Sequence, residues 1–403
     1  MKRKMEGTYR NSTEVGSLGG QPIYMADVVD ACLTGRLNLF LQGDTGSGKT
    51  QLARDVMGYF PGKNTFVLGR NDMDVRELFQ QINLGKLKTA KNTAELKEVT
   101  SKVNNHLTVV DELPNCVPAV RAQLFNMFDG YIEIDGVAYP IGKGYSVGIA
   151  TGNIGQRFTE SSNELGRALR DRMHVIVDVD YFHPTGSDTL EILSGNTNPR
   201  VEFDRQDADR SREVIKRYEA IGAMPVPLEK LVIANYLIHG LDHCSKGSKR
   251  KMKDAWPTQL EDHEQGSDVG LILPVSTRAA KSIVRLSQSL DQVAREKGGN
   301  PEAFESMMQA FRLVAPYSGI LNEADVQGKY EGNHYGAVDA VISTTTTQYN
   351  GQKPNIAAGL KMVLKGEKDK KVLDNFTGRW SFMRDTLDGL LRGKTQGSVA
   401  MED

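Results

Sequence analysis

The sequence predicts an α/β fold in which helices cover both faces of a parallel sheet, followed by a smaller helical domain. In the first half of the chain, short apolar segments rich in β-branched residues alternate with segments of helical length. Strands that alternate with helices form parallel sheets, and a strand that is apolar along its whole length is buried on both faces. From about residue 227 onward, apolar residues recur mainly at helical spacing.

Strands are expected where an apolar run is short and is bounded by turn residues. The expected strands lie at 37–41, 65–68, 107–110, 146–150 and 174–179. A helix is expected over 23–33, ahead of the first of these strands. In the second half of the chain, the periodicity predicts helices at 228–240, 276–296 and 301–315.

These segments also suggest how the chain divides into domains. Its 403 residues exceed the ~250–300 residues that a single core supports. An apolar stripe from Phe376 to Leu391 is expected to dock on the chain's own core, with a partner helix as the alternative. We expect an N-terminal arm at 1–22, an α/β core at 23–184, linker helices at 185–225, a helical lid domain at 226–350 with a hydrophilic insertion at 245–268, and a helical C-terminal extension at 351–403.

The composition excludes several classes of protein. A hydrophobic content of 39% with 25% charged residues is typical of a globular chain and not of a disordered one. No apolar run approaches the ~20 residues that span a bilayer, and the basic N-terminus lacks the apolar stretch of a secretory signal. The three cysteines have neither disulfide nor metal-ligand spacing. These features favour a reduced, cytoplasmic protein.

The charge pattern gives little support to nucleic-acid binding. The formal net charge is -1, so no global field attracts a polyanion. The basic run 246–253 is followed by the acidic segment 261–264. A solvated loop is therefore favoured over a nucleic-acid site there.

The first expected strand leads into a glycine-rich turn with the pattern G-x-x-x-x-G-K-T. Glycines allow successive backbone N–H groups to point at phosphate oxygens, and the N-terminus of the following helix adds to this attraction. Lys49 should neutralise the β- and γ-phosphates of ATP, and the Thr50 hydroxyl should bind Mg²⁺. A flexible loop without a ligand is the alternative, which the flanking strand and helix disfavour. The predicted phosphate-binding residues are Gly43, Asp44, Thr45, Gly46, Ser47, Gly48, Lys49, Thr50 and Gln51.

A second chemical signal is a pair of acids, Asp111 and Glu112, at the end of the apolar strand 107–110. Phosphoryl transfer needs one carboxylate to hold the metal ion and another group to orient the attacking water. Asp111 is expected to hold Mg²⁺ through water, and Glu112 is expected to polarise the attacking water. The strand and helix between Lys49 and this pair make the combination more specific than either motif alone.

At this point the residues resemble the AAA+ ATPases of the MoxR and dynein-related group, which carries a helix-2 insert and a pre-sensor-1 hairpin. Segment 113–127 resembles the helix after that family's acidic pair. Segment 131–141 resembles the hairpin that these proteins insert before their next sheet strand. Segment 149–153 resembles the sensor-1 segment, which implies that Asn153 faces the γ-phosphate and the attacking water.

Segment 164–173 resembles the part of these proteins that carries an arginine finger, a guanidinium that stabilises charge on the transferred phosphoryl group. In the family this arginine reaches the nucleotide of the adjacent subunit. Arg172 aligns best with it, and Arg167 and Arg170 compete for the role. A surface salt bridge is the alternative for each of them.

Segment 274–280 resembles the sensor-2 motif at the start of a lid helix. The resemblance implies that Arg278 contacts the γ-phosphate, and a solvent-facing arginine is the alternative. The likeness to the family covers residues 20–182 closely and 225–320 loosely.

The resemblance implies an ATP-hydrolysing homo-oligomeric ring, six subunits being the family expectation, that remodels or activates a protein partner. Two other functions stay open: a nucleic-acid-associated NTPase, which segment 246–253 alone supports, and a nucleotide-gated scaffold that hardly hydrolyses ATP. The intact Glu112 and Arg172 disfavour the scaffold.

Overall fold

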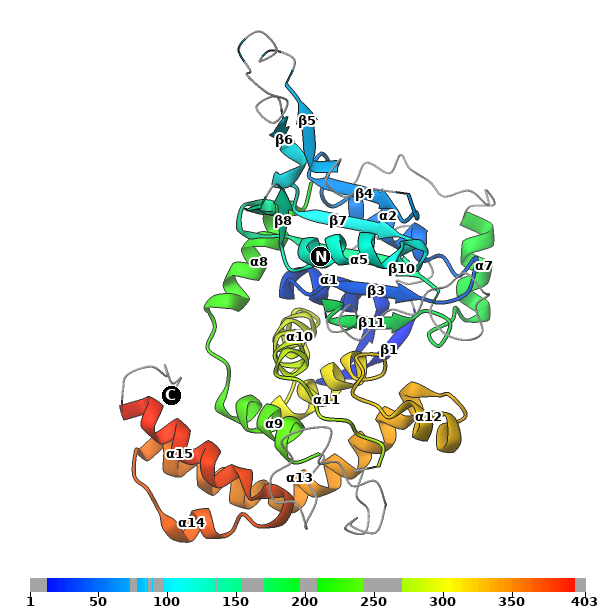
Figure 1. Ribbon diagram of the computed structural model, residues 1–403. Helices are drawn as coiled ribbons and strands as arrows, with labels where there is room; N and C mark the ends of the chain where they lie inside the picture. The colour runs from blue at the N-terminus through cyan, green and yellow to red at the C-terminus, as the bar shows by residue number, and fades with distance from the viewer. Residues whose placement is uncertain are drawn as a thin grey trace. The chain divides into compact units, whose positions relative to one another are not determined.

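The chain divides into two compact units (Figure 1). The α/β unit comprises Met1–Gly16 and Pro22–Ile221, and the helical unit comprises Ser17–Gln21 and Gly222–Asp403. The structure, a computed structural model, describes residues 13–72, 78–83, 85, 89, 97–134, 136–153, 170, 172–195, 209–241 and 270–395.

The α/β unit is built on a parallel five-stranded sheet with the strand order β11-β3-β10-β7-β4. Every residue of β3, β7 and β10 is buried, which explains why these segments are apolar throughout. The predicted parallel sheet is confirmed. Its strands are β3 (Leu39–Gln42), β4 (Asn64–Leu68), β7 (Leu107–Asp111), β10 (Val147–Gly152) and β11 (Val175–Asp178).

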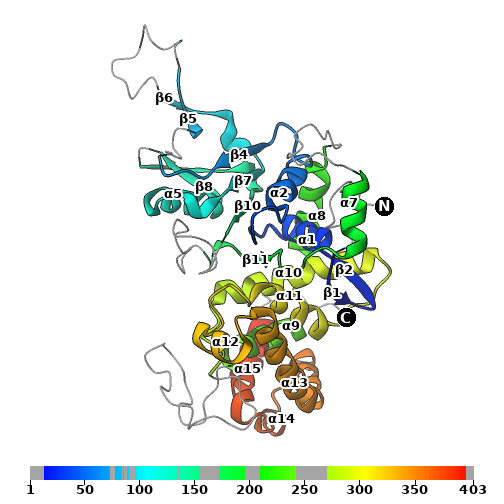
Figure 2. The ribbon, with the colours of Figure 1, turned by 90° about the vertical axis from the view of Figure 1, so that its right-hand side faces the viewer.

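Helices lie on both faces of this sheet, as the sequence predicts. Figure 2 shows α5 on one side and α1 and α2 on the other. Two further helices, α7 and α8, follow β11 in the chain. The helices of the unit are α1 (Met25–Gly35), α2 (Lys49–Met57), α5 (Pro118–Phe128), α7 (Gly186–Gly195) and α8 (Ser211–Ala223).

Three two-stranded sheets accompany the main sheet. The last of them, β8 with β9, is the hairpin that the sequence predicts, and it pairs antiparallel from Tyr131–Pro140 to Ile134–Val137. The first sheet, β1 with β2, begins in the segment that we expected to be an N-terminal arm. Leu18 and Ile23 are fully buried and hold this segment in place. The strands are β1 (Glu14–Leu18), β2 (Gln21–Tyr24), β5 (Gln80–Ile82), β6 (Lys97–Val99), β8 (Tyr131–Ile134) and β9 (Val137–Pro140).

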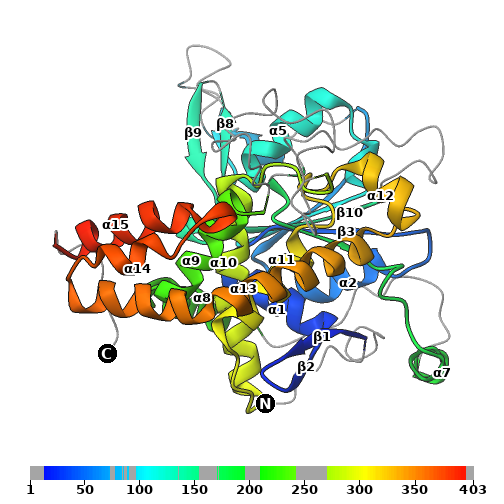
Figure 3. The same cartoon turned by 90° about the horizontal axis from the view of Figure 1, so that it is seen from below.

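The helical unit packs its helices around α9, α10 and α11. In Figure 3, α13 runs beside α14 and α15. The apolar stripe of the C-terminal segment docks here as expected, since Phe376, Met383 and Leu387 are fully buried. The helices are α9 (Leu228–His239), α10 (Thr277–Glu296), α11 (Ala303–Val314), α12 (Glu323–Tyr330), α13 (His334–Lys365), α14 (Lys370–Asp374) and α15 (Phe382–Thr395).

One helix crosses a domain boundary that we expected. Helix α13 continues through residues 350 and 351, so the lid domain and the C-terminal extension are not separated there. Within this helix, Thr344 Oγ1 donates to Ala340 O at 3.2 Å and Thr346 Oγ1 to Ile342 O at 2.7 Å, which satisfies both hydroxyls. The burial of Tyr349 and Ile356 on either side of residue 350 offsets the low helix propensity of the threonines. The expected insertion at 245–268, with its basic run, lies outside the described residues.

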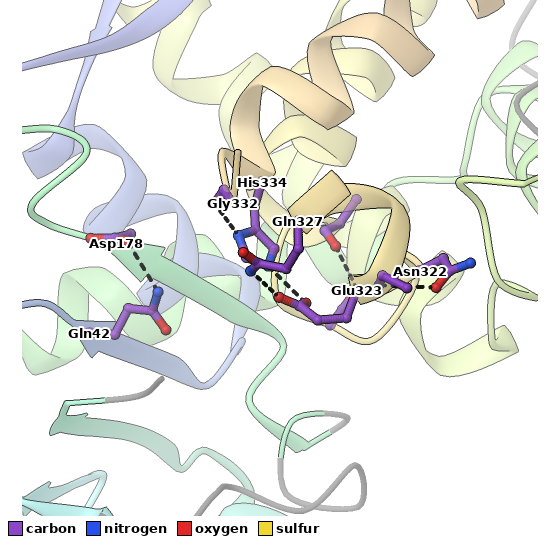
Figure 4. A network of polar contacts seen from close by, with 10 residues as sticks. Gln42, Asp178, Asn322, Glu323, Gln327, Gly332 and His334 are labelled. Carbon is purple, nitrogen blue, oxygen red and sulfur yellow. Dashed lines mark hydrogen bonds and ion pairs between the residues drawn. The ribbon is translucent and has the colours of Figure 1, made fainter. Parts of the chain in front are cut away.

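Polar contacts join α12 to the start of α13 (Figure 4). His334 Nε2 lies 3.0 Å from Glu323 Oε2, and His334 Nδ1 lies 3.0 Å from Gly332 O. Gln327 Nε2 donates to the other oxygen of Glu323 at 2.8 Å. These contacts close the turn between the two helices.

Within the described part of the chain, no single helix is long and apolar enough to cross a membrane; α8 and α9 reach that length and composition only when counted together.

A buried ion pair lies between α9 and α10. Lys230 Nζ donates to Asp291 Oδ2 at 2.6 Å and to Ser287 Oγ at 3.0 Å, and Lys230 is 1% exposed. Burial lowers the pKa of Lys230, while the Asp291 carboxylate raises it. The lysine therefore depends on Asp291 to stay charged inside the unit.

We expect Asp291→Ala to destabilise the helical unit by about 3–5 kcal/mol, because it leaves a buried lysine without its carboxylate. Thermal unfolding followed by circular dichroism measures the effect. The control is Asp325→Ala, which removes the partly exposed partner of the exposed Lys329 and should cost less than ~1 kcal/mol. Equal effects of the two variants would contradict the assigned role of the buried pair.

Candidate active site

The residues predicted to bind nucleotide meet at the carboxyl ends of three neighbouring strands. Strand β10 pairs with β3 on one side and with β7 on the other, in the registers Thr151–Leu41 and Ala150–Val110. Parallel strands end at the same edge of a sheet, so the segments after β3, β7 and β10 come together there. The sheet order, and not closeness in sequence, assembles the site.

The loop between β3 and α2 has the conformation that its glycines allow. Gly46 and Gly48 have φ of 81° and 78°, in the left-handed region. No side chain caps the N-terminus of α2, and its first turn carries no acidic residue. The loop and this helix end therefore suit an anion such as a phosphate group.

Lys49 is buried within the loop and is held by backbone carbonyls. Its Nζ donates to Gly43 O and Asp44 O, both at 2.8 Å, and lies 3.3 Å from Ser47 Oγ. Burial lowers the pKa of Lys49, and nearby carboxylates, first that of Glu112, raise it. The ammonium group is thus fixed in place beside several acids.

Asp111 links the loop to the two other strands. Its Oδ1 accepts a hydrogen bond from Thr50 Oγ1 at 3.0 Å and another from Thr151 Oγ1 at 2.5 Å. Thr50 and Asp111, predicted to bind Mg²⁺ together, are therefore in direct contact. Their oxygens are the kind of ligand that Mg²⁺ prefers, so the residues fit the ion.

Thr151 is a site residue that sequence reasoning did not single out. It is fully buried, bonds to Asp111, and accepts a hydrogen bond from the Glu112 backbone N–H at 3.1 Å. The available signal was a polar residue near the end of an otherwise apolar strand, two positions before Asn153.

Glu112 has a backbone conformation that is uncommon for its residue type. Its φ of 57° lies in the left-handed region, which costs energy for any residue other than glycine. Burial raises the pKa of Glu112, the charge of Asp111 raises it further, and Lys49 lowers it. Such strain and such a shift are typical of a functional group.

Asn153 follows β10 and carries a buried acceptor. Among the described residues, its Oδ1 is buried and has no hydrogen-bond partner. Buried acceptors of this kind are rare in folded proteins. The atom is therefore free to accept a hydrogen bond from a bound molecule or water.

Gln51, predicted to line the phosphate site, directs its side chain elsewhere. Its Nε2 donates to Asp55 Oδ1 at 2.7 Å, one turn further along α2. Only the backbone of Gln51, in the first turn of the helix, is then available to phosphate.

The predicted arginines lie in different places. Arg172 Nε donates to Asp129 Oδ2 at 2.9 Å, and its guanidinium carbon lies 5.1 Å from the centre of the Phe125 ring. Arg170 is described as helical, and Arg167 lies outside the described residues. Arg278 is exposed on the first turn of α10 in the helical unit, where Ser276 caps the helix through the Ala279 N–H at 3.0 Å.

The comparisons with known proteins agree with this geometry. Residues 38–173 match the family model of the AAA domain of the dynein-related subfamily. A proposed ATPase from Cytophaga hutchinsonii superposes with a TM-score of 0.55 at 16% identity, over 79% of this chain and 88% of the other. At that identity the likeness shows the fold alone. A search of curated proteins gave no match. Residues 38–173 thus form an AAA domain of the dynein-related subfamily.

Proposed function

We propose that this ATPase works as a Mg²⁺-dependent ring that remodels or activates a protein partner. The observation that carries the proposal is the meeting of Lys49, Thr50, Asp111 and Glu112 at one edge of the sheet. These groups supply what phosphoryl transfer to water requires: charge neutralisation, metal ligands and a base.

The loop of residues 43–51 binds the phosphates through backbone N–H groups, and Lys49 neutralises their charge. Thr50 and Asp111 would hold Mg²⁺, which would offset the negative charge of the phosphates. Thr151 keeps the Asp111 carboxylate oriented through their 2.5 Å hydrogen bond. The hydrogen bond between Thr50 Oγ1 and Asp111 Oδ1 supports the proposal that these two residues hold the metal ion together.

Glu112 accepts a proton from the attacking water, and Asn153 orients that water. The backbone N–H of Glu112 is anchored to Thr151, which places the start of its side chain beside the metal ligands. The buried, unpartnered Oδ1 of Asn153 supports its role, because a water molecule would satisfy it.

Arg172 acts on the nucleotide of the neighbouring subunit, with Arg170 and Arg167 as the competing candidates. Its contacts with Asp129 and Phe125 hold the guanidinium in one orientation. Such an arrangement suits an arginine that a neighbour uses, since an ordered side chain loses less entropy on binding. AAA+ proteins commonly form rings, and a hexamer is the family expectation.

The β8–β9 hairpin is the proposed contact with the protein partner. Val137 at its tip is an apolar side chain that is 52% exposed. Arg278 in the helical unit is the proposed sensor of the γ-phosphate.

The first test is the steady-state ATPase rate per subunit against protein concentration, with mass photometry alongside. We expect the rate to rise as rings form. Glu112→Gln should lower kcat by at least ~10²-fold while ATP still binds, and Arg172→Ala should lower it by roughly 10³-fold. Glu219→Gln, on the exposed side of α8, is the matched control.

Mixing the two inactive variants tests whether the arginine acts between subunits. An interface between a Glu112→Gln subunit and an Arg172→Ala subunit can hold one intact glutamate and one intact arginine. Mixed rings should therefore regain ATPase activity that neither variant has alone. If Arg172→Ala is active, or if mixing restores nothing, Arg172 is not the finger, and Arg170→Ala becomes the next variant to measure.

The pH dependence of kcat follows from the raised pKa of Glu112. The residue must be ionised to accept a proton, so activity is present above that pKa and falls as the pH drops through it. The midpoint of this fall in kcat, the acid limb of the pH profile, should then lie above ~4.3, the pKa of an unperturbed glutamate. Glu112→Asp should move the limb, whereas a limb caused by ATP ionisation would stay in place.

A photoreactive side chain placed at position 137 tests the partner surface. In a Glu112→Gln background, which holds ATP, we expect ATP-dependent adducts with a protein partner in cell extract. The same side chain at position 364 is the control, because Leu364 is 48% exposed on α13 of the helical unit. Equal labelling from both positions would contradict a role for the hairpin.

A further inference from the structure

The turn after β11 contacts the first residues of the phosphate loop. Asp180 Oδ2 accepts a hydrogen bond from the Asp44 backbone N–H at 2.5 Å. A Cβ atom on Gly43 would lie 2.6 Å from Val179 Cγ2 and 3.0 Å from Asp180 Oδ1. Only glycine fits at the start of the loop, because the turn lies directly against it.

The contact reaches Lys49 through a single peptide group. The Gly43–Asp44 peptide donates its N–H to Asp180, and its carbonyl, Gly43 O, accepts from Lys49 Nζ at 2.8 Å. Lys49 also bonds to the next carbonyl, Asp44 O, at 2.8 Å. A carboxylate on the N–H side polarises the peptide and strengthens the carbonyl as an acceptor.

The turn that carries Asp180 is itself fixed. Asp178 Oδ1 accepts the backbone N–H groups of Asp180 at 2.9 Å and Tyr181 at 3.3 Å. Its other oxygen accepts from Gln42 Nε2 at 3.2 Å, a bond drawn in Figure 4. Gln42 is the last residue before the loop, so β11 holds the entry of the loop at two points.

Asp180 also contributes charge. Together with Glu112, Asp44 and Asp111, its carboxylate raises the pKa of Lys49 against the effect of burial. The carboxylate thus acts on the lysine both through the peptide and through space.

We propose that Asp180 is a positioning residue that sets the place of Lys49 in the phosphate loop through the Gly43–Asp44 peptide. The inference rests on the proposed role of Lys49 as the phosphate-binding lysine. The hydrogen bond that Asp180 accepts comes from the loop backbone at Asp44, so its proposed effect on the phosphates runs through Lys49.

The test is ATP affinity, measured by titration with a fluorescent ATP analogue, for Asp180→Ala, Asp180→Asn, Lys49→Ala and the double variant Asp180→Ala/Lys49→Ala. Asp180→Ala should weaken binding about three- to tenfold, as expected for a partly exposed charged hydrogen bond. Asp180→Asn keeps an acceptor oxygen and should recover most of the affinity. The control Asp209→Ala removes a surface ion pair with Lys63 in the same unit and should bind as the wild type does.

The double variant separates positioning from a general structural role. If Asp180 acts through Lys49, Asp180→Ala should change affinity by less than about twofold once Lys49 is alanine, since the two effects are not additive. Equal losses in both backgrounds, or wild-type affinity of Asp180→Ala, would overturn the proposal. Should Asp180→Ala unfold, the same comparison with Asp180→Leu, which also lacks an acceptor oxygen, decides. Wild-type affinity of Lys49→Ala would instead refute the phosphate role of the lysine itself.

Discussion

A single carboxylate oxygen, Asp111 Oδ1, holds the site together. Hydroxyls from the first turn of α2, which follows the loop after β3, and from the end of β10 both donate to it, while Asp111 itself ends β7. Three strands that are distant in sequence are thereby joined at one atom. The cost of leaving such a buried carboxylate unsatisfied is high, so these bonds also stabilise the edge of the sheet.

The neighbouring groups depend on the same junction. Thr151, held by Asp111, anchors the backbone N–H of Glu112, whose left-handed conformation persists only because its surroundings impose it. On the other side, β11 fixes the start of the loop through Asp178 and Asp180. These bonds hold the polar groups of the site in fixed positions, which favours electrostatic stabilisation of the reaction without reorganisation.

The helical unit shows a different balance of forces. Its core is mainly apolar, but it encloses the pair Lys230–Asp291 and the hydroxyl of Ser287. Such a pair contributes little net stability and penalises packings in which the partners separate. The fold by itself does not identify what the protein acts on, because one fold supports many functions. The chemistry at the sheet edge supports the ATPase activity, and the proposal of a partner surface rests on the exposed hairpin.

The sequence alone was enough to predict the parallel sheet, the phosphate loop with Lys49 and Thr50, and the acidic pair, because local apolar runs and motif spacing encode them. The hairpin and the docking of the apolar stripe were predicted on the same basis.

Three features were decided by the tertiary structure alone: the shared bonds of Asp111, the inclusion of Thr151, and the contact of Asp180 with the loop. Each joins residues between 40 and 136 positions apart, and a lone polar side chain near a strand end gives no local sign of its partner. The continuity of α13 past residue 350 was also missed, since its threonines, Gly351 and Pro354 disfavour a helix locally, and the burial of side chains such as Tyr349 and Ile356 overrides that preference.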